Sequence, residues 1–301
     1  MGARMSELRI RNANRIFTPS YVLIILLPVT FLTVCGCKAV ERRVIYRPDR
    51  YPQKWCEPAE SLAEENGADG LKLENACFPS RDGTKLHGWF VRPLKEAESN
   101  QAESVAVLFI HGRSGNISSL QPDLFEFVKR HQVPVFVFDY RGYGKSEGRP
   151  SESGLYDDAR AARDWLAARV QIPPQQVVLM GRSLGAAVAV ELAACDGARA
   201  LVLENGFTSI PEMLQHFTGG ILKGRCLEAK YASINKIENY TGPVFISHAK
   251  NDKIVPFEHG ARLAAAATAA SSVRFVELEG NHHSRAHQAY NSTLNEFLKR
   301  H

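Results

Sequence analysis

The stretch Val177-Val178-Leu179-Met180-Gly181-Arg182-Ser183-Leu184-Gly185-Ala186-Ala187 decides the fold, because it has the pattern of a buried strand that runs directly into a helix. It contains G-x-S-x-G, which is typical of a nucleophilic serine on a sharp strand-to-helix turn. A side chain at Gly181 or Gly185 would collide with neighbouring backbone in such a turn. Ser183 is then exposed at the corner, where the start of the helix favours a developing negative charge.

The composition describes an ordinary globular chain. Of its 301 residues, 45% are hydrophobic and 23% are charged, which is enough for one large core. The net charge is +5, and the residues before Cys37 supply +3 of it through Arg4, Arg9, Arg11 and Arg15 against Glu7. The remainder is nearly neutral, which argues against a nucleic-acid-binding surface.

Residues 1–36 predict a targeting segment. Arginines up to Arg15 precede an apolar run from Tyr21 to Val34. As a helix this run would rise about 21 Å, short of the roughly 30 Å hydrocarbon core, which favours a signal peptide. Val34-Cys35-Gly36-Cys37 also resembles a bacterial lipoprotein box, in which cleavage leaves Cys37 to be lipid-modified. An uncleaved signal anchor is the alternative, and in both cases we expect the folded domain outside the cytoplasm, tethered to a membrane of the cell envelope.

Residues 37–70 are polar and interrupted by prolines, which predicts a spacer before a domain over residues 71–301. An oxidising compartment would permit disulfides, but the sequence does not choose among the three pairings open to Cys56, Cys77, Cys195 and Cys226. No C-x-x-C or histidine-rich spacing indicates a metal site, and we expect no cofactor.

The rest of the chain alternates apolar strands with helices. Leu71–Phe78 and Lys85–Val91 flank Arg81-Asp82-Gly83 and predict an antiparallel hairpin at the sheet edge. Further strands are expected at Val105–Ile110, Val135–Phe138, Val177–Met180, Ala200–Leu203, Val244–Ser247 and Val273–Leu278. Helices are expected between them, including Ser153–Val170 and the alanine-rich run Ala264–Ala270. This alternation predicts an α/β fold with a mostly parallel sheet and helices on both faces.

Functional residues of such a sheet gather at the carboxyl ends of its strands. His111-Gly112-Arg113-Ser114-Gly115-Asn116 follows the first parallel strand, and its Arg113 N–H could form an oxyanion hole with the Leu184 N–H. We interpret His111 as bracing this loop rather than transferring protons. Asp252 follows a later strand on a tight loop and is the candidate acid.

Two adjacent histidines follow the last strand in Gly280-Asn281-His282-His283, and each could serve as the base. We favour His282, because it stands two residues past Gly280, whereas His283 would open the last helix.

The order Ser183, Asp252, His282 is that of the α/β-hydrolases, which the chain resembles from Leu71 to its end. Within that superfamily His111–Asn116, Asp139–Ser146 and Leu203–Ser209 are similar to the BEM46-like and ABHD-type serine hydrolases. The resemblance implies an α/β-hydrolase fold with about eight strands and a structural role for Asp139. It places any lid between the sixth and seventh strands, where residues 205–242 suit a small partial cap.

The chain departs from this group at Arg113-Ser114, where the group commonly carries Asn-Ala, and at His283, where Asn is usual. Arg113 would still donate through its backbone, while its side chain could add positive charge near the substrate.

These patterns predict a membrane-anchored serine hydrolase that cleaves carboxylic esters or thioesters through an acyl-enzyme. The apolar residues of the cap segment either bind lipid or long acyl chains or merely cover the sheet. A serine peptidase of the aminopeptidase or prolyl-peptidase kind is the alternative enzyme. A hydrolase-shaped binding protein is the alternative outside enzymes, although such proteins tend to lose a triad member. The sequence leaves the oligomeric state open.

Overall fold

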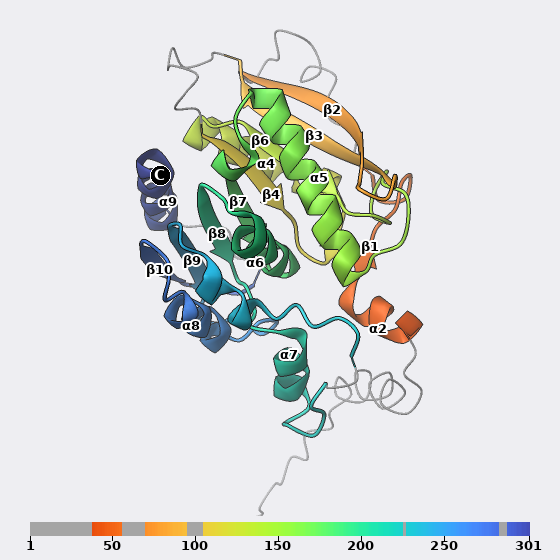
Figure 1. Cartoon of the computed structure of the whole chain (residues 1–301), viewed down its shortest axis with the longest axis vertical. Helices are drawn as coiled ribbons and strands as arrows, with labels where there is room; N and C mark the ends of the chain where they lie inside the picture. Colours follow the sequence, from red (N-terminus) through yellow and green to blue (C-terminus); the bar gives the residue numbers. More distant parts are fainter. Residues whose placement is uncertain (1–37, 56–69, 95–104, 225–226, 283–287) are drawn as a thin grey trace, which may run out of the picture.

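The computed structural model describes residues 38–55, 70–94, 105–224, 227–282 and 288–301 (Figure 1). Its centre is an eight-stranded sheet in the order β10-β9-β8-β7-β4-β6-β3-β2. Only β3 runs against its neighbours, because it pairs antiparallel with both β2 and β6. The strands are β2 Leu71–Pro79, β3 Lys85–Pro93, β4 Ala106–Ile110, β6 Val135–Asp139, β7 Val177–Arg182, β8 Ala200–Glu204, β9 Val244–Ala249 and β10 Val273–Leu278. The predicted hairpin and all six parallel strands are confirmed.

Helices cover both faces of the sheet, as the alternating pattern predicts (Figure 1). On one face lie α5, α6 and α8, and on the other lie α4 and α9. Their bounds are α4 Gln121–His131, α5 Glu152–Val170, α6 Leu184–Asp196, α8 Phe257–Ala266 and α9 Gln288–Arg300. The alanine-rich run Ala264–Ala270 was expected to be helical, but α8 ends at Ala266, so the predicted helix was too long.

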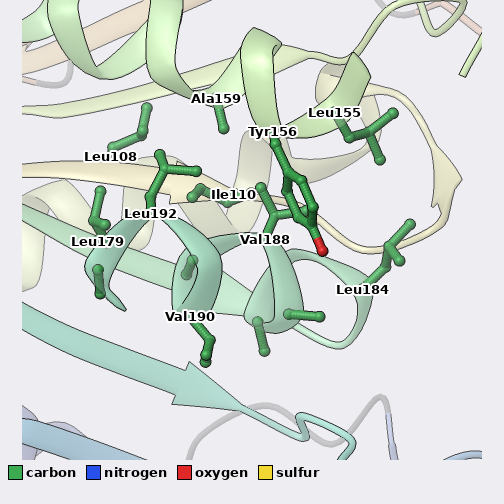
Figure 2. Packing of buried hydrophobic residues seen from close by; sticks show 14 of the residues in the cluster. Leu108, Ile110, Leu155, Tyr156, Ala159, Leu179, Leu184, Val188, Val190 and Leu192 are labelled. Atoms are coloured by element: carbon green, nitrogen blue, oxygen red, sulfur yellow. The ribbon is translucent and has the colours of Figure 1, made fainter. Parts of the chain in front are cut away.

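Two cores form because successive side chains of a strand point to opposite faces. In β7, Val177 and Leu179 join the core under α5 and α6, whereas Val178 and Met180 join the core under α4 and α9. Figure 2 shows the first of these cores, where α5 and α6 pack their apolar side chains over β4 and β7. Burial on both faces explains why these strands are apolar throughout.

Residues 38–55, which we call the strap, pack onto the domain. The strap contains helix α2 (Lys38–Ile45) and strand β1 (Arg47–Pro48), which pairs in parallel with β5 (Ser114–Gly115). The side chains of Ile45 and Tyr46 are buried in the main core. This part of the expected spacer is therefore folded. Composition does not reveal it, because the strap is anchored by backbone pairing with a loop 67 residues away, Arg47 with Ser114 and Pro48 with Gly115.

The segment between β8 and β9 is small, as expected of a partial cap. It contains helix α7 (Ile210–Phe217) and two short 3-10 turns at Ser233–Asn235 and Ile237–Asn239. Figure 1 shows α7 projecting away from the sheet. None of the helices in the described ranges is both long and apolar enough to cross a membrane.

Candidate active site

Ser183 lies at the turn between β7 and α6, in a backbone conformation that is rare for a residue with a side chain. Its φ is 54° and its ψ is −113°, and its N–H donates to the Glu204 carbonyl at 2.9 Å. A Cβ at Gly185 would lie 1.9 Å from the Ile110 carbonyl oxygen, and one at Gly181 would lie 2.3 Å from the Gly185 oxygen. Both obstacles are backbone atoms, so the sharp turn requires glycine at both positions.

Asp252 and His282 come from different loops and meet at the same edge of the sheet. His282 Nδ1 lies 2.6 Å from Asp252 Oδ2, and both residues are buried. The other carboxylate oxygen, Oδ1, accepts the backbone N–H groups of Ile254 at 2.8 Å and Val255 at 2.9 Å. The carboxylate is thereby fixed, and it holds the His282 ring in one orientation.

The environment keeps Asp252 ionised. Burial alone would raise the pKa of its carboxyl, but the hydrogen bond with His282 and those from the Val255 and Ile254 amides outweigh it. The pKa therefore lies below its ordinary value. A carboxylate that stays charged can stabilise an imidazolium beside it.

The loop after β4 lies directly against Ser183. A Cβ built on Gly112 would lie 3.7 Å from the Ser183 Cβ, which is an ordinary van der Waals contact, so this part of the loop adjoins the serine. His111 is buried, and its Nδ1 lies 2.7 Å from the Gly112 carbonyl oxygen. Burial lowers the pKa of this histidine, so it is neutral at pH 7. These contacts are those of a residue that braces the loop.

Arg113 is held by its carbonyl group and by its side chain. Its carbonyl accepts the Tyr143 hydroxyl at 2.8 Å and the Arg47 N–H at 2.9 Å. Its guanidinium donates to the Val44 carbonyl at 2.8 Å. The side chain is thus engaged with the end of α2, which differs from the expectation that it could add charge near the substrate.

The strap supplies further contacts to this loop. Asp49 N–H donates to the Gly115 carbonyl at 3.1 Å. The Asn116 side-chain amide donates to the carbonyls of Asp49 at 3.2 Å and Lys54 at 3.3 Å. Asp139 completes the support from the other side, because its Oδ1 accepts the Ile117 N–H at 2.9 Å. This contact agrees with a structural role for Asp139.

Asn205 is a site residue that the sequence reasoning missed. It follows β8 with φ at 47°, and its side-chain amide donates to the His282 carbonyl at 3.1 Å. Its side-chain oxygen accepts the Ala249 N–H at 3.0 Å. One side chain therefore connects the ends of β8 and β9 with the His282 loop. The available signal was an Asn-Gly pair directly after a buried strand, where left-handed backbone favours asparagine.

His248 was also missed. It is fully buried on β9, with Nε2 at 2.9 Å from the Val255 carbonyl oxygen and 3.6 Å from Asp252 Oδ2. Burial lowers its pKa, so it stays neutral and donates from Nε2 to the carbonyl. It stabilises the turn whose amides hold Asp252.

A second polar cluster begins at Arg182, the residue that precedes Ser183. Arg182 Nε donates to Glu204 at 2.7 Å, and Tyr290 donates to the same carboxylate. The Glu204 charge raises the pKa of Arg182. These three residues are among those that line a cavity of about 260 Å³, whose walls also include residues of α4 and α9. The cavity has mainly apolar walls and opens on the face away from α5 and α6, so we assign the chemistry to Ser183 and not to this space.

Several predictions concern residues outside the described ranges: the signal segment 1–36, Cys37, Cys56, Cys226 and the alternative base His283. Within the described ranges, Cys77 and Cys195 are free and exposed. The same ranges contain no group of three or more side chains able to hold a metal ion.

Comparison with known proteins places these features in a family. A family model of the alpha/beta hydrolase fold matches residues 105–224. The chain is 36% identical over 245 residues to the uncharacterized protein Rv2307c of Mycobacterium tuberculosis, covering 81% of this chain and 80% of the relative. It is 33% identical over 229 residues to the alpha/beta hydrolase domain-containing protein WAV2 of Arabidopsis thaliana, covering 71% and 73%.

A solved structure supports the same fold. The Pyrococcus furiosus esterase Pf2001 aligns with a TM-score of 0.63 at 19% identity, covering 85% of this chain and 98% of that one.

Proposed function

The chain belongs to the α/β-hydrolase family, and from that premise we propose that it is a serine hydrolase that cleaves carboxylic esters or thioesters. The observation that carries the proposal is the 2.6 Å pair of His282 and Asp252 at the sheet edge that also presents Ser183 on its strained turn. In this assignment Ser183 is the nucleophile, His282 the base and Asp252 the residue that orients it.

The proposed reaction begins when the Ser183 hydroxyl attacks the acyl carbon of the substrate. Because His282 Nδ1 faces Asp252 and carries a proton, Nε2 is left to accept the proton of the serine. Asp252 then stabilises the imidazolium, and the N–H groups of Arg113 and Leu184 bind the oxyanion. Leu184 is the first residue of α6, so its N–H has no partner within the helix.

His282 next gives its proton to the leaving group, and an acyl-enzyme remains on Ser183. Water attacks this ester with His282 again as the base, and the released acid restores the serine. In this assignment the strap and the residues Tyr143 and Asn116 fix the loop that carries the Arg113 N–H.

An ester substrate is consistent with the esterase among the solved structures that share this fold. The apolar, half-exposed residues of the cap segment suit a lipid or long acyl chain. We place the chain with the BEM46-like and ABHD-type hydrolases on the motifs at His111–Asn116, Asp139–Ser146 and Leu203–Ser209. We also propose that the N-terminus anchors it to a membrane of the cell envelope, through Cys37 if the lipoprotein box is processed.

Labelling with a fluorophosphonate probe, which reacts with activated serines, tests the assignment. Wild type should label, Ser183→Ala should not, and Asp252→Asn and His282→Ala should label about 10³-fold to 10⁴-fold more slowly. Labelling of His282→Ala at the wild-type rate would instead identify His283 as the base. A folded wild type that never labels would favour a binding protein and refute the proposal.

Two further measurements test the finer points. The ratio kcat/KM across p-nitrophenyl esters should rise with acyl chain length, and activity confined to the acetate would contradict the long-chain preference. Cleavage of peptide amides without any chain-length preference for esters would favour a peptidase. Incorporation of labelled palmitate that is lost in Cys37→Ser would support lipidation, and equal labelling of both proteins would contradict it.

A further inference from the structure

Helix α7 carries an apolar stripe that the domain covers only in part. Ile210 and Met213 pack against the main core. The stripe continues through Leu214 and Phe217 into the turn at Ile221 and Leu222, and we call these last four residues the α7 tip. Phe217 is 46% exposed and Ile221 is 79% exposed, and no residue of α7 is fully buried.

The α7 tip is held in place although it is exposed. Ser209 caps the helix by accepting the Glu212 N–H at 3.2 Å, and the Thr218 hydroxyl donates to the Leu214 carbonyl at 2.8 Å. Glu212 is paired with Arg262 of α8. These contacts fix the helix, so the exposed side chains are presented at a defined position.

The turn after α7 extends into open space. Gly219 and Gly220 have φ angles of 58° and 86°, and a Cβ built on either would meet no atom within 4 Å. The backbone returns at Gly224, whose carbonyl accepts the Lys230 ammonium at 3.2 Å. The exposed apolar side chains therefore stand at the end of a projection, where the described residues leave them uncovered.

Basic residues accompany the apolar tip. Lys223 is exposed in the same turn. Figure 1 shows α2 at the same end of the molecule as α7, and the last turn of α2 carries Arg42 and Arg43. The acidic residue of α2, Glu41, is buried and accepts the N–H groups of Glu228 and Ala229, which ties α2 to the chain that follows the tip. An apolar tip beside basic side chains is complementary to an anionic lipid surface.

The position of α2 in the sequence also supports an orientation of this end toward a membrane. Helix α2 begins at Lys38, and in the sequence the apolar run Tyr21–Val34 ends only a few residues earlier. Any membrane contact of that run would therefore bring the α2 end of the domain, and α7 with it, next to the bilayer.

We propose that the α7 tip and α2 form a docking surface for an anionic phospholipid bilayer, with Phe217 and Ile221 entering the interface and Arg42, Arg43 and Lys223 facing the headgroups. This docking goes beyond the proposed catalytic function and does not depend on it, because a protein lacking Ser183 would dock equally. It would hold the cap segment at the lipid surface, where acyl substrates reside.

Tryptophan quenching by brominated phospholipids tests the docking on the full chain in vesicles of phosphatidylcholine and phosphatidylglycerol. The fluorescence of the variant I221W should be quenched more than that of the wild type, which contains only the native tryptophans. Its emission maximum should also shift to shorter wavelength. The control is V273W, on β10, where the native side chain is 40% exposed. It should show neither change. Repeating both in the Ser183→Ala background separates the result from catalysis.

Quenching of I221W no greater than that of V273W would overturn the proposal. Quenching that is unchanged in R42Q/R43Q would overturn the part assigned to the arginines. A protein that is dimeric without lipid and becomes monomeric in F217S/I221S would show that a second copy covers the tip, and would also overturn it.

Discussion

Replacing Ser183 by glycine should stabilise the protein relative to Ser183→Ala, because the backbone at this position is strained. With φ at 54° and ψ at −113°, the residue lies outside the regions that L-amino acids populate readily. Alanine keeps the Cβ and therefore the strain, whereas glycine adopts this conformation freely. Both variants lack the hydroxyl, so their difference isolates the backbone.

The expected difference follows from three contributions. Relief of the strained conformation is worth about 1–3 kcal/mol. Glycine lowers the free energy of unfolding by about 0.4–1 kcal/mol, because it gives the unfolded chain more conformational freedom. Loss of the half-buried Cβ costs less than the ~0.8 kcal/mol of a fully buried methylene. The net gain for glycine over alanine is therefore about 1 kcal/mol, which corresponds to a rise in Tm of about 2–4 °C.

Urea unfolding of the two variants measures this difference directly. The matched control is Ala189→Gly in the helical interior of α6, where glycine should destabilise by about 1–2 kcal/mol, because it lowers helix propensity and removes a buried methyl group. If Ser183→Gly were less stable than Ser183→Ala, with the control behaving as expected, the turn would not be strained and the argument would fail.

Three more predictions concern Asn205, His259 and Gly185. Asn205→Asp keeps the oxygen that accepts the Ala249 N–H but loses the N–H that donates to the His282 carbonyl. The free energy of unfolding should therefore fall by about 2 kcal/mol, and fluorophosphonate labelling should slow. Unchanged labelling would show that Asn205 does not belong to the site. Burial lowers the pKa of His259 to about 4, so the unfolded state takes up the proton first as pH falls, and about 2 kcal/mol of stability should be lost between pH 8 and pH 5. His259→Asn should flatten this loss in urea titrations, and an unaltered slope would contradict the assignment. Gly185→Ala should lower the free energy of unfolding by more than about 4 kcal/mol, because the added Cβ would lie 1.9 Å from a backbone oxygen. The control Gly219→Ala lies in open space and should lose only ~1 kcal/mol, the cost of left-handed backbone for a residue with a side chain. Thermal unfolding of both variants measures the difference.

The sheet and its order could be predicted because each central strand is a short apolar run between turn residues. The same periodicity located the carboxyl ends, and with them Ser183, Asp252 and His282. The approach of His282 to Asp252 followed from topology alone, since strands that are parallel and neighbouring end at one edge.

The parts that could not be predicted depend on contacts between distant backbone groups. The pairing of Arg47 with Ser114 leaves no periodic signal, because two residues of strand are too few to show one. The direction of the Arg113 side chain depends on where α2 ends, and the role of Asn205 depends on two loops meeting at its side chain. For this reason the composition of residues 38–55 predicted a spacer and not a folded strap.

The strap has a practical consequence for anyone who prepares this protein. A fragment that starts at Leu71, where the regular strands begin, would lack the partners of Arg113, Gly115, Asn116 and Gly144. A polypeptide trimmed at the first unambiguous strand could then purify well and still be inert, and its inactivity would be mistaken for the wrong choice of substrate. Expression should begin at or before Lys38, and a side-by-side comparison with the fragment that starts at Leu71 separates loss of the strap from a wrong choice of substrate.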